Sequence, residues 1–274
     1  MRLFLLTALT MVAFAANSVL NRAAVGAGGM DPVAFGAVRV AAGAATLGLL
    51  VAWQGRGFAL GGGGRAVAVA GLLVYIFGFS LAYLGLDAGL GALILFGTVQ
   101  VTMFAGALVA REPVPGARWL GAALGLAGLG WLMWPGGAVA VSAWHGGLML
   151  AAGVGWGVYS LQGRKERDAT QATAMNFLLA APVAVVAGLA LGGTMSGSGI
   201  VLAVVSGVVT SGMGYALWYA VLPGLGATRA AVAQLTVPVI ALGGGMVFLG
   251  EPVTWRFVGA GVLVIGGVLV SLRR

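Results

Sequence analysis

The chain has no cysteine, one histidine and six acidic residues among its 274 residues. The lack of cysteine excludes disulfides and thiol chemistry. With so few titratable side chains there is no metal-ligand cluster, nucleophile motif or phosphate-binding loop, so we expect neither an enzyme nor a bound cofactor. Charged residues make up 7% of the chain, whereas a soluble domain has about 25%. A soluble domain is therefore not expected either.

Long hydrophobic runs fill the sequence, and 61% of the residues are hydrophobic. An apolar stretch of about 17–25 residues crosses a bilayer as a helix. The pattern predicts an all-α membrane protein with ten transmembrane helices. We expect these near residues 3–20, 32–53, 66–86, 88–110, 117–134, 145–163, 171–192, 199–221, 228–250 and 254–271.

The basic residues gather on one side of these ten segments. The side that holds the N-terminus receives Arg2, Arg56, Arg65, Arg111, Arg118, Arg164, Lys165, Arg167, Arg229, Arg273 and Arg274. The other side receives only Arg22 and Arg256. The positive-inside rule then predicts a multi-pass protein of the cell inner (cytoplasmic) membrane with both termini in the cytoplasm. Because these charges are scattered over short loops, nucleic acid is not an expected partner.

The two halves of the chain resemble each other. Gly89–Ala92 recurs as Gly224–Ala227, and Glu112-Pro113-Val114 recurs as Glu251-Pro252-Val253. We predict two five-helix repeats, residues 1–138 and 139–274, of which the second is inverted because five is odd. Inverted repeats around a central site are the architecture of many secondary transporters. The alternative is that duplication only builds a stable bundle.

These motifs also resemble those of the EamA type of the drug/metabolite transporter superfamily. The positions that carry the resemblance are Phe14–Asn21, Arg39, Tyr83–Ala92, Glu112-Pro113, Trp156–Arg164, Tyr219–Ala227 and Glu251-Pro252. Phe14 and Gln100 depart from it, since the family often has Trp and Pro there. The resemblance implies a ten-helix basket around a central cavity and the export of small metabolites. In overall pattern the chain is similar to bacterial aromatic amino-acid exporters of this superfamily.

Polar and aromatic residues recur at helical spacing in several predicted spans, which puts them on common helix faces. Packing between helices is the alternative use of such residues. Matching stripes in both halves favour a cavity whose aromatic walls suit an amphipathic or aromatic small molecule. The predicted substrate-binding residues are Phe14, Asn17, Arg39, Tyr75, Phe79, Tyr83, Gln100, Trp156, Tyr159, Ser160, Tyr215, Trp218 and Gln234.

Arg39 is the charged residue that we place well inside a span, roughly 10 Å from its end at 1.5 Å per residue. Charges within a membrane are costly, so they are usually functional or paired. One hypothesis is that Arg39 meets a substrate carboxylate. The alternative is a structural arginine that binds helix-end carbonyls or extends outward to the membrane surface.

No acidic residue is expected in the middle of a span, where a proton-coupled multidrug pump would carry one. This favours facilitated diffusion or exchange. Glu112 and Glu251, each followed by proline, are interpreted as caps or gate hinges between helices. Pro182 and Pro238 lie inside spans, where each frees backbone groups and can act as a hinge.

Glycine-rich faces in the fifth and tenth spans, with Gly121, Gly125, Gly128, Gly259, Gly261 and Gly266, suit close helix contact. They can serve within one chain or in a homodimer. The predicted function is a secondary transporter, an exporter or facilitator, that moves amino acids, aromatic ones among them, and similar small metabolites across the lipid bilayer by alternating access. The alternatives are a multidrug or other metabolite efflux pump and a non-transporting accessory membrane subunit.

Overall fold

The computed structural model describes residues 1–26, 29–58, 64–111, 115–134, 142–163, 166, 168–234 and 236–271. Within these ranges the side chains of residues 118, 169, 219, 222, 223, 226–232, 268 and 271 are excepted. Every regular element in this part of the chain is a helix, and the only extended pairing in it is an isolated bridge between Met30 and Met195.

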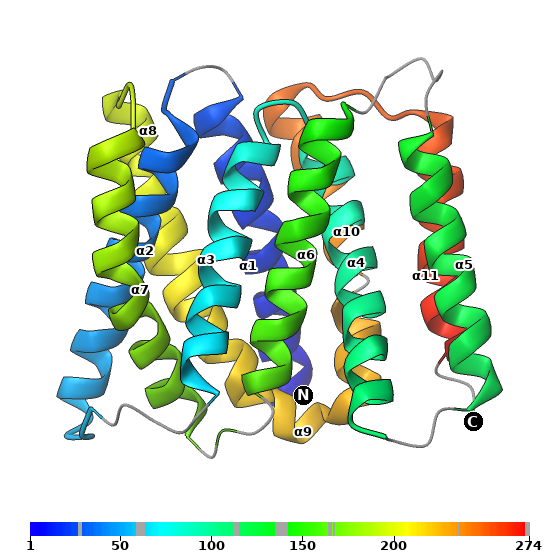
Figure 1. Cartoon of the computed structure of the whole chain (residues 1–274), viewed down its shortest axis with the longest axis horizontal. Helices are drawn as coiled ribbons and strands as arrows, with labels where there is room; N and C mark the ends of the chain where they lie inside the picture. Colours follow the sequence, from blue (N-terminus) through cyan, green and yellow to red (C-terminus); the bar gives the residue numbers. More distant parts are fainter. Residues whose placement is uncertain are drawn as a thin grey trace.

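The helices run roughly antiparallel in one bundle (Figure 1). Their bounds are α1 Arg2–Val25, α2 Pro32–Trp53, α3 Arg65–Ala82, α4 Ala88–Val109, α5 Gly116–Met133, α6 Ala143–Gly163, α7 Ala169–Leu191, α8 Gly197–Val205, η1 Ser206–Met213, α9 Gly214–Gln234, α10 Thr236–Leu249 and α11 Trp255–Ser271.

Six helical segments of the described chain are long and apolar enough to cross a membrane, and three shorter apolar helices accompany them. Large hydrophobic side chains such as Phe4, Leu189 and Phe248 are mostly exposed on the outside of the bundle, where lipid rather than water is their natural solvent. Trp53 and Trp144, exposed near helix ends, suit the membrane interface. The chain is thus a multi-pass membrane protein.

Short polar residues fix where several helices begin. The Asp31 carboxylate accepts hydrogen bonds from the backbone N–H groups of Val33 and Ala34, and Pro32 takes the first position of α2. Asp168 caps α7 and Ser196 caps α8 in the same way. These side chains satisfy backbone donors that the first helical turn leaves free. The bounds of α2 agree with the predicted span for this reason.

The predicted eighth and ninth spans are the ones whose bounds differ from the sequence pattern. The eighth span is formed by α8, the π-helix η1 and the start of α9, and α9 continues to Gln234 through the expected boundary near 222–227. Figure 1 shows α9 at the lower edge of the bundle. Hydropathy predicts where the chain leaves the hydrocarbon core of the bilayer, but it does not predict where the helix ends, because a helix can continue beyond that point.

Glycine contacts set the distances between the central helices. A Cβ atom on Gly71 of α3 would lie 2.8 Å from the carbonyl oxygen of Gly155 on α6, and one on Gly155 would lie 2.6 Å from the carbonyl oxygen of Gly71. The backbones of α3 and α6 therefore touch at this point. Gly207 of η1 lies in the same way against the backbone carbonyl of Arg39 on α2. Small residues permit such close approach in membrane bundles.

The glycine faces of the fifth and tenth spans meet each other within this chain, because α5 packs along α11. A Cβ atom on Gly267 would lie 2.6 Å from the carbonyl oxygen of Gly121 and 3.0 Å from the backbone nitrogen of Gly125. Gly128 lies against Leu263 and Val264. Of the two uses expected for these faces, packing within one chain is the one seen.

We predict that Gly267→Ala destabilises the α5–α11 pair while Gly266→Ala does not. The added methyl at position 267 would overlap backbone atoms, whereas one at position 266 meets nothing within 4 Å. Overpacking of this kind costs about 1–3 kcal/mol, which corresponds to a fall in Tm of several degrees. Gly266→Ala should leave Tm unchanged or raise it, since alanine favours helix. Intrinsic tryptophan fluorescence of the detergent-purified protein measures both, and equal Tm values for the two variants would contradict the contact.

Candidate functional site

A small closed cavity lies between α1, α3, α4, α6 and α9. Its lining residues are Phe14, Asn17, Ser18, Tyr75, Phe79, Leu95, Phe96, Trp156 and Tyr215. The space available to the centre of a water molecule is about 10 Å³, which is room for about one water molecule. The cavity is therefore closed around itself in this conformation, and a larger guest would have to displace its walls.

Phe14 stands at the middle of an aromatic cluster. Its ring lies 5.8 Å from the ring centres of Trp156 and Tyr215 and 5.7 Å from that of Trp218, each time edge to face. Trp156 also stacks on Tyr159, with 5.4 Å between the ring centres. Such pairs contribute about 0.5–1.5 kcal/mol each beyond their buried area. Three predicted residues from α6 and α9 thus contact Phe14, and Tyr159 joins the cluster through Trp156.

The predicted stripe of α3 faces the same cluster. The Tyr75 ring lies 4.9 Å from Trp156 and 5.3 Å from Phe79, and Phe79 packs edge to face on Tyr83 at 4.7 Å. All three side chains of α3 are buried. Tyr83 is turned away from the cavity lining, because its hydroxyl donates to the carbonyl oxygen of Ala88.

Asn17 connects this cluster to the π-helix. Its side-chain nitrogen donates to the Tyr75 hydroxyl at 3.2 Å, and its oxygen accepts from the hydroxyls of Ser206 at 2.6 Å and Thr210 at 3.1 Å. Ser206 and Thr210 were not among the predicted site residues. Their spacing in the sequence could have identified them, because two hydroxyl residues four positions apart in an apolar segment lie on one helix face. π-Helical turns occur frequently at functional sites.

Arg39 is fully buried, with no exposed surface. Its Nε donates to the Ser211 hydroxyl at 2.8 Å, and its Nη2 donates to the hydroxyls of Tyr75 at 3.0 Å and Tyr215 at 2.9 Å. The guanidinium also lies over the rings of Tyr75 and Phe79, 5.2 and 5.3 Å from their centres. Its hydrogen bonds go to hydroxyls rather than to helix-end carbonyls, and its side chain does not reach the surface. These contacts fit a structural role as well as a role in substrate binding.

Several other predicted residues lie away from the cavity lining. Gln100 on α4 and Gln234 at the end of α9 are partly buried, and the Ser160 hydroxyl donates to the carbonyl oxygen of Trp156 on its own helix. Pro182 is exposed within α7, and Pro238 is buried within α10. Glu112 lies outside the described residues. In the described part of the chain, no three His, Asp or Glu side chains come together as a metal site.

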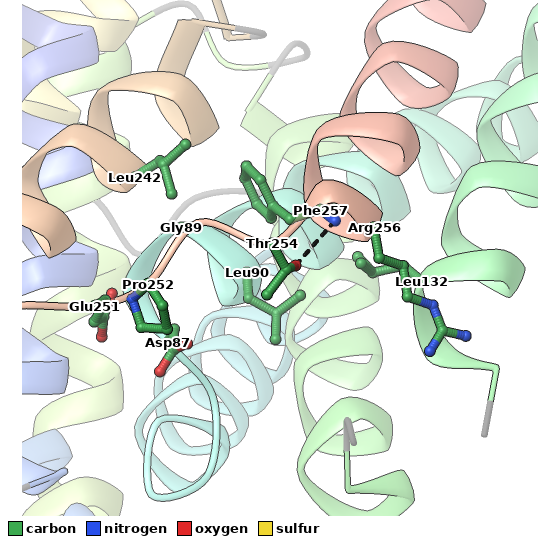
Figure 2. Close-up of a pocket in the computed structure, with 10 residues that line it drawn as sticks. All are labelled: Asp87, Gly89, Leu90, Leu132, Leu242, Glu251, Pro252, Thr254, Arg256 and Phe257. Atoms are coloured by element: carbon green, nitrogen blue, oxygen red, sulfur yellow. Dashed lines mark hydrogen bonds between the residues drawn. The ribbon is translucent and has the colours of Figure 1, made fainter. Parts of the chain in front are cut away.

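One end of the bundle, here called the Glu251 end, is closed by an ionic cluster. Arg22 at the end of α1 pairs with Glu251 at 3.3 Å and with Asp87 at 3.6 Å, and it donates to the Tyr83 carbonyl oxygen at 2.8 Å. Figure 2 shows Glu251 and Asp87 on one side of a second small cavity and Arg256 on the other. The cluster joins α1, α3, α4 and the segment after α10.

Glu251 caps a helix, although a distant one. Its Oε2 accepts from the backbone N–H of Ala88 at the start of α4, at 2.8 Å. The helix that follows Glu251 in the chain, α11, begins only at Trp255, so Glu251 caps α4 rather than its own following helix. Its side chain is 7% exposed. Burial, reinforced by the nearby charge of Asp87, raises the pKa of Glu251, against the opposing effects of the Ala88 N–H and of Arg22.

The raised pKa predicts how stability depends on pH. A carboxyl group that holds its proton more tightly when folded contributes stability below its unfolded pKa, and that contribution is lost as pH rises through the folded value. Acidification from pH 8 to pH 4.5 should therefore raise the Tm of the wild type relative to Glu251→Gln, whose side chain cannot titrate. Fluorescence melting across this pH range measures the difference. A wild type that loses stability relative to Glu251→Gln on acidification would contradict the cause given for the shift.

Comparison with known proteins identifies the group to which this bundle belongs. Residues 144–273 match the model of the EamA-like transporter family. An uncharacterized protein of Pseudomonas aeruginosa is 44% identical over 273 residues, which cover 99% of this chain and 94% of that protein. An uncharacterized transporter of Archaeoglobus fulgidus is 37% identical over 68 residues, 25% of each chain.

A solved crystal structure shares the fold. It superposes with a TM-score of 0.70 over 97% of each chain at 19% sequence identity, a level that speaks for the fold alone. The family model covers the helices that carry Trp156 and Tyr215, and the close relative extends over the rest of the bundle. The chain belongs to the EamA-like transporter family, whose members move small metabolites across membranes.

Proposed function

We propose that this protein is a secondary transporter that carries amino acids, including aromatic ones, and similar small metabolites across the inner membrane by alternating access. The observation that carries the proposal is the closed cavity of Phe14, Tyr75, Trp156 and Tyr215 inside a membrane helix bundle. Aromatic faces with a few hydrogen-bonding groups suit the ring or aliphatic side chain of an amino acid. The predicted substrate-binding role of these residues is part of the proposal.

The helix contacts support an inverted repeat of residues 1–138 and 139–274. In such a repeat α1 corresponds to α6, α2 to α7, α3 to the α8–η1–α9 segment, α4 to α10 and α5 to α11. The contact of α3 with α6 then has its counterpart in the contact of α1 with the α8–η1–α9 segment, and the contact of α4 with α6 in that of α10 with α1. Phe14 and Trp156, at matching positions of the two halves, touch each other.

In this scheme the Glu251 end is the external gate, and the ion pairs of Arg22 with Asp87 and Glu251 support a shut gate in this conformation. The charge distribution of the sequence puts Arg2 and Arg65 on the cytoplasmic side and Arg22 on the external side. The ionic cluster of Arg22, Asp87 and Glu251 would then separate when the outside is open. The proposed gating roles extend to Pro182, Pro238 and, by the repeat, Glu112. Alternating access around a site at the repeat interface is common to transporters of this architecture.

The first test is uptake of radiolabelled amino acids into proteoliposomes by the wild type, Trp156→Ala, Trp156→Phe and Trp144→Ala. We expect saturable uptake of aromatic amino acids that is independent of a pH gradient. Trp156→Ala should raise KM about tenfold or more, since each aromatic contact is worth about 0.5–1.5 kcal/mol, and Trp156→Phe should be intermediate. Trp144 lies on the same helix but is 70% exposed, so its replacement should leave KM unchanged.

The outcomes of this test separate the candidate functions. Absence of uptake across a broad panel of amino acids and metabolites would contradict the proposal and favour a non-transporting accessory subunit. Uptake of hydrophobic cations driven by a proton gradient would favour multidrug efflux. Size-exclusion profiles and Tm values show that each variant is folded.

The second test introduces two cysteines that can form a disulfide. Because the chain has no cysteine of its own, the introduced pair is the one that reacts. A Cβ atom on Gly244 of α10 lies 3.9 Å from the Cβ atom of Val19 on α1, within the range that a disulfide needs. Oxidation of the Val19→Cys/Gly244→Cys protein should hold the Glu251 end shut and abolish uptake, and dithiothreitol should restore it. The two single-cysteine variants are the controls. Full uptake by the cross-linked protein would mean that these helices do not separate during transport.

A further inference from the structure

Arg39 carries a positive charge that no described carboxylate balances. The acidic side chains in the described chain all have partners elsewhere: Asp31 caps α2, Asp87 and Glu251 pair with Arg22, Glu166 with Arg65 and Asp168 with Arg56. A buried charge is costly unless it is paired and hydrogen-bonded. Arg39 has three hydrogen bonds to neutral hydroxyls, and its Nη1 makes none with the described side chains and backbone.

The hydroxyl oxygens around Arg39 act as hydrogen-bond acceptors for the arginine. The Tyr75 hydroxyl oxygen accepts from Arg39 at 3.0 Å and from Asn17 at 3.2 Å, which uses both of its lone pairs. The Tyr75 and Tyr215 hydroxyls lie 3.1 Å apart and share one hydrogen bond. One of the two hydroxyl protons of this pair therefore remains to be donated. The Asn17 oxygen is likewise used by Ser206 and Thr210.

The cavity wall next to Arg39 therefore offers hydrogen-bond donors. Tyr75, Asn17 and Trp156 line the cavity. The indole N–H of Trp156 is buried and has no acceptor among the described atoms. None of the described residues that line the cavity carries a carboxylate. A group that fits here must accept several hydrogen bonds and carry negative charge, as a carboxylate does.

Aromatic walls alone would also suit a cation, but the position of Arg39 argues against one. The guanidinium already lies over the faces of Tyr75 and Phe79. A second positive charge in the same small cavity would be repelled at short range in a low-dielectric interior. The charge that this site lacks is negative.

We propose that the cavity is selective for organic anions. The substrate's carboxylate docks on the free hydroxyl proton of the Tyr75–Tyr215 pair and on the Trp156 indole N–H, with Arg39 behind them as its counter-charge. Its apolar body lies against Phe14, Phe79 and Phe96. This inference rests on the proposed transport function and names its substrate class: monocarboxylates bind best, zwitterionic amino acids next and amines least. Arg39 acts through Tyr75 and Tyr215 and sets the preference for negative charge.

The test is equilibrium binding of three radiolabelled probes with one ring: 3-phenylpropionate, phenylalanine and phenethylamine, which are anionic, zwitterionic and cationic at pH 7. The full chain is used in detergent, as wild type, Arg39→Gln, Arg39→Lys and Tyr75→Phe. The matched control is Arg56→Gln, which removes an exposed arginine that pairs with Asp168 and does not line the cavity. Uptake of phenylalanine into proteoliposomes is measured separately.

We expect the wild type to prefer 3-phenylpropionate over phenethylamine. Arg39→Gln should weaken 3-phenylpropionate binding about tenfold or more, as expected for the loss of a nearby opposite charge in a low-dielectric interior, and reduce the anion-to-cation affinity ratio. Arg39→Lys should keep part of the preference, and Arg56→Gln all of it. Tyr75→Phe keeps the ring and should reduce the same ratio, which provides the test if Arg39→Gln does not fold.

Two results would overturn the inference while leaving transport intact: equal wild-type affinity for the amine and the acid, or an unchanged ratio in folded Arg39→Gln. A purely structural Arg39 would lower Tm and weaken all three probes alike. If no probe binds and phenylalanine is not taken up, the proposed function fails together with the inference.

Discussion

The bilayer offers no hydrogen-bond partner, so polar side chains inside this bundle depend on partners within the protein. Arg39 shows what this demands. Its Nε and Nη2 have acceptors because α3 and the η1–α9 segment bring Tyr75, Ser211 and Tyr215 to them at 2.8–3.0 Å. One buried charge thus fixes the relative position of three helical segments. The residues that meet this demand are also the ones that line or border the cavity.

Small residues make that geometry reachable. Hydroxyl groups on short side chains can meet the guanidinium only if the backbones approach closely, and Gly207 lies directly against the backbone of Arg39. The contact of Gly71 with Gly155 does the same for α3 and α6, which brings Tyr75 within ring contact of Trp156. The glycines and the polar network are therefore parts of one arrangement. A larger residue at either contact would move a cavity wall.

The sequence pattern was enough to locate the helices because length, hydropathy and caps all act within a few residues. The bounds of α2 follow from Asp31, Pro32 and the apolar run after them. Helix spacing also predicted that Phe14, Tyr75, Trp156 and Tyr215 face inward. It failed for Ser160, whose hydroxyl bonds its own helix backbone, an option that serine often takes.

What the sequence could not provide depends on contacts between distant segments. The ion pair of Arg22 with Glu251 joins residues 229 positions apart, and no local pattern marks it. The π-helix is also hidden, because its extra residue per turn changes which side chains share a face without changing hydropathy. Ser206 and Thr210, which donate to Asn17, lie in this π-helix.

The closed cavity and the closed Glu251 end are mechanically connected through α1. Phe14 and Arg22 are eight residues apart on this helix, which is about 12 Å at 1.5 Å per residue. Phe14 fills the middle of the aromatic cluster, and Arg22 holds Glu251, Asp87 and the Tyr83 carbonyl.

In the proposed cycle a substrate must displace the Phe14 ring before it can bind. A helix is stiff over two turns, so this displacement moves Arg22 and strains its ion pairs. Substrate binding and gate opening then draw on the same motion, and a substrate that binds one conformation better shifts the carrier towards that conformation.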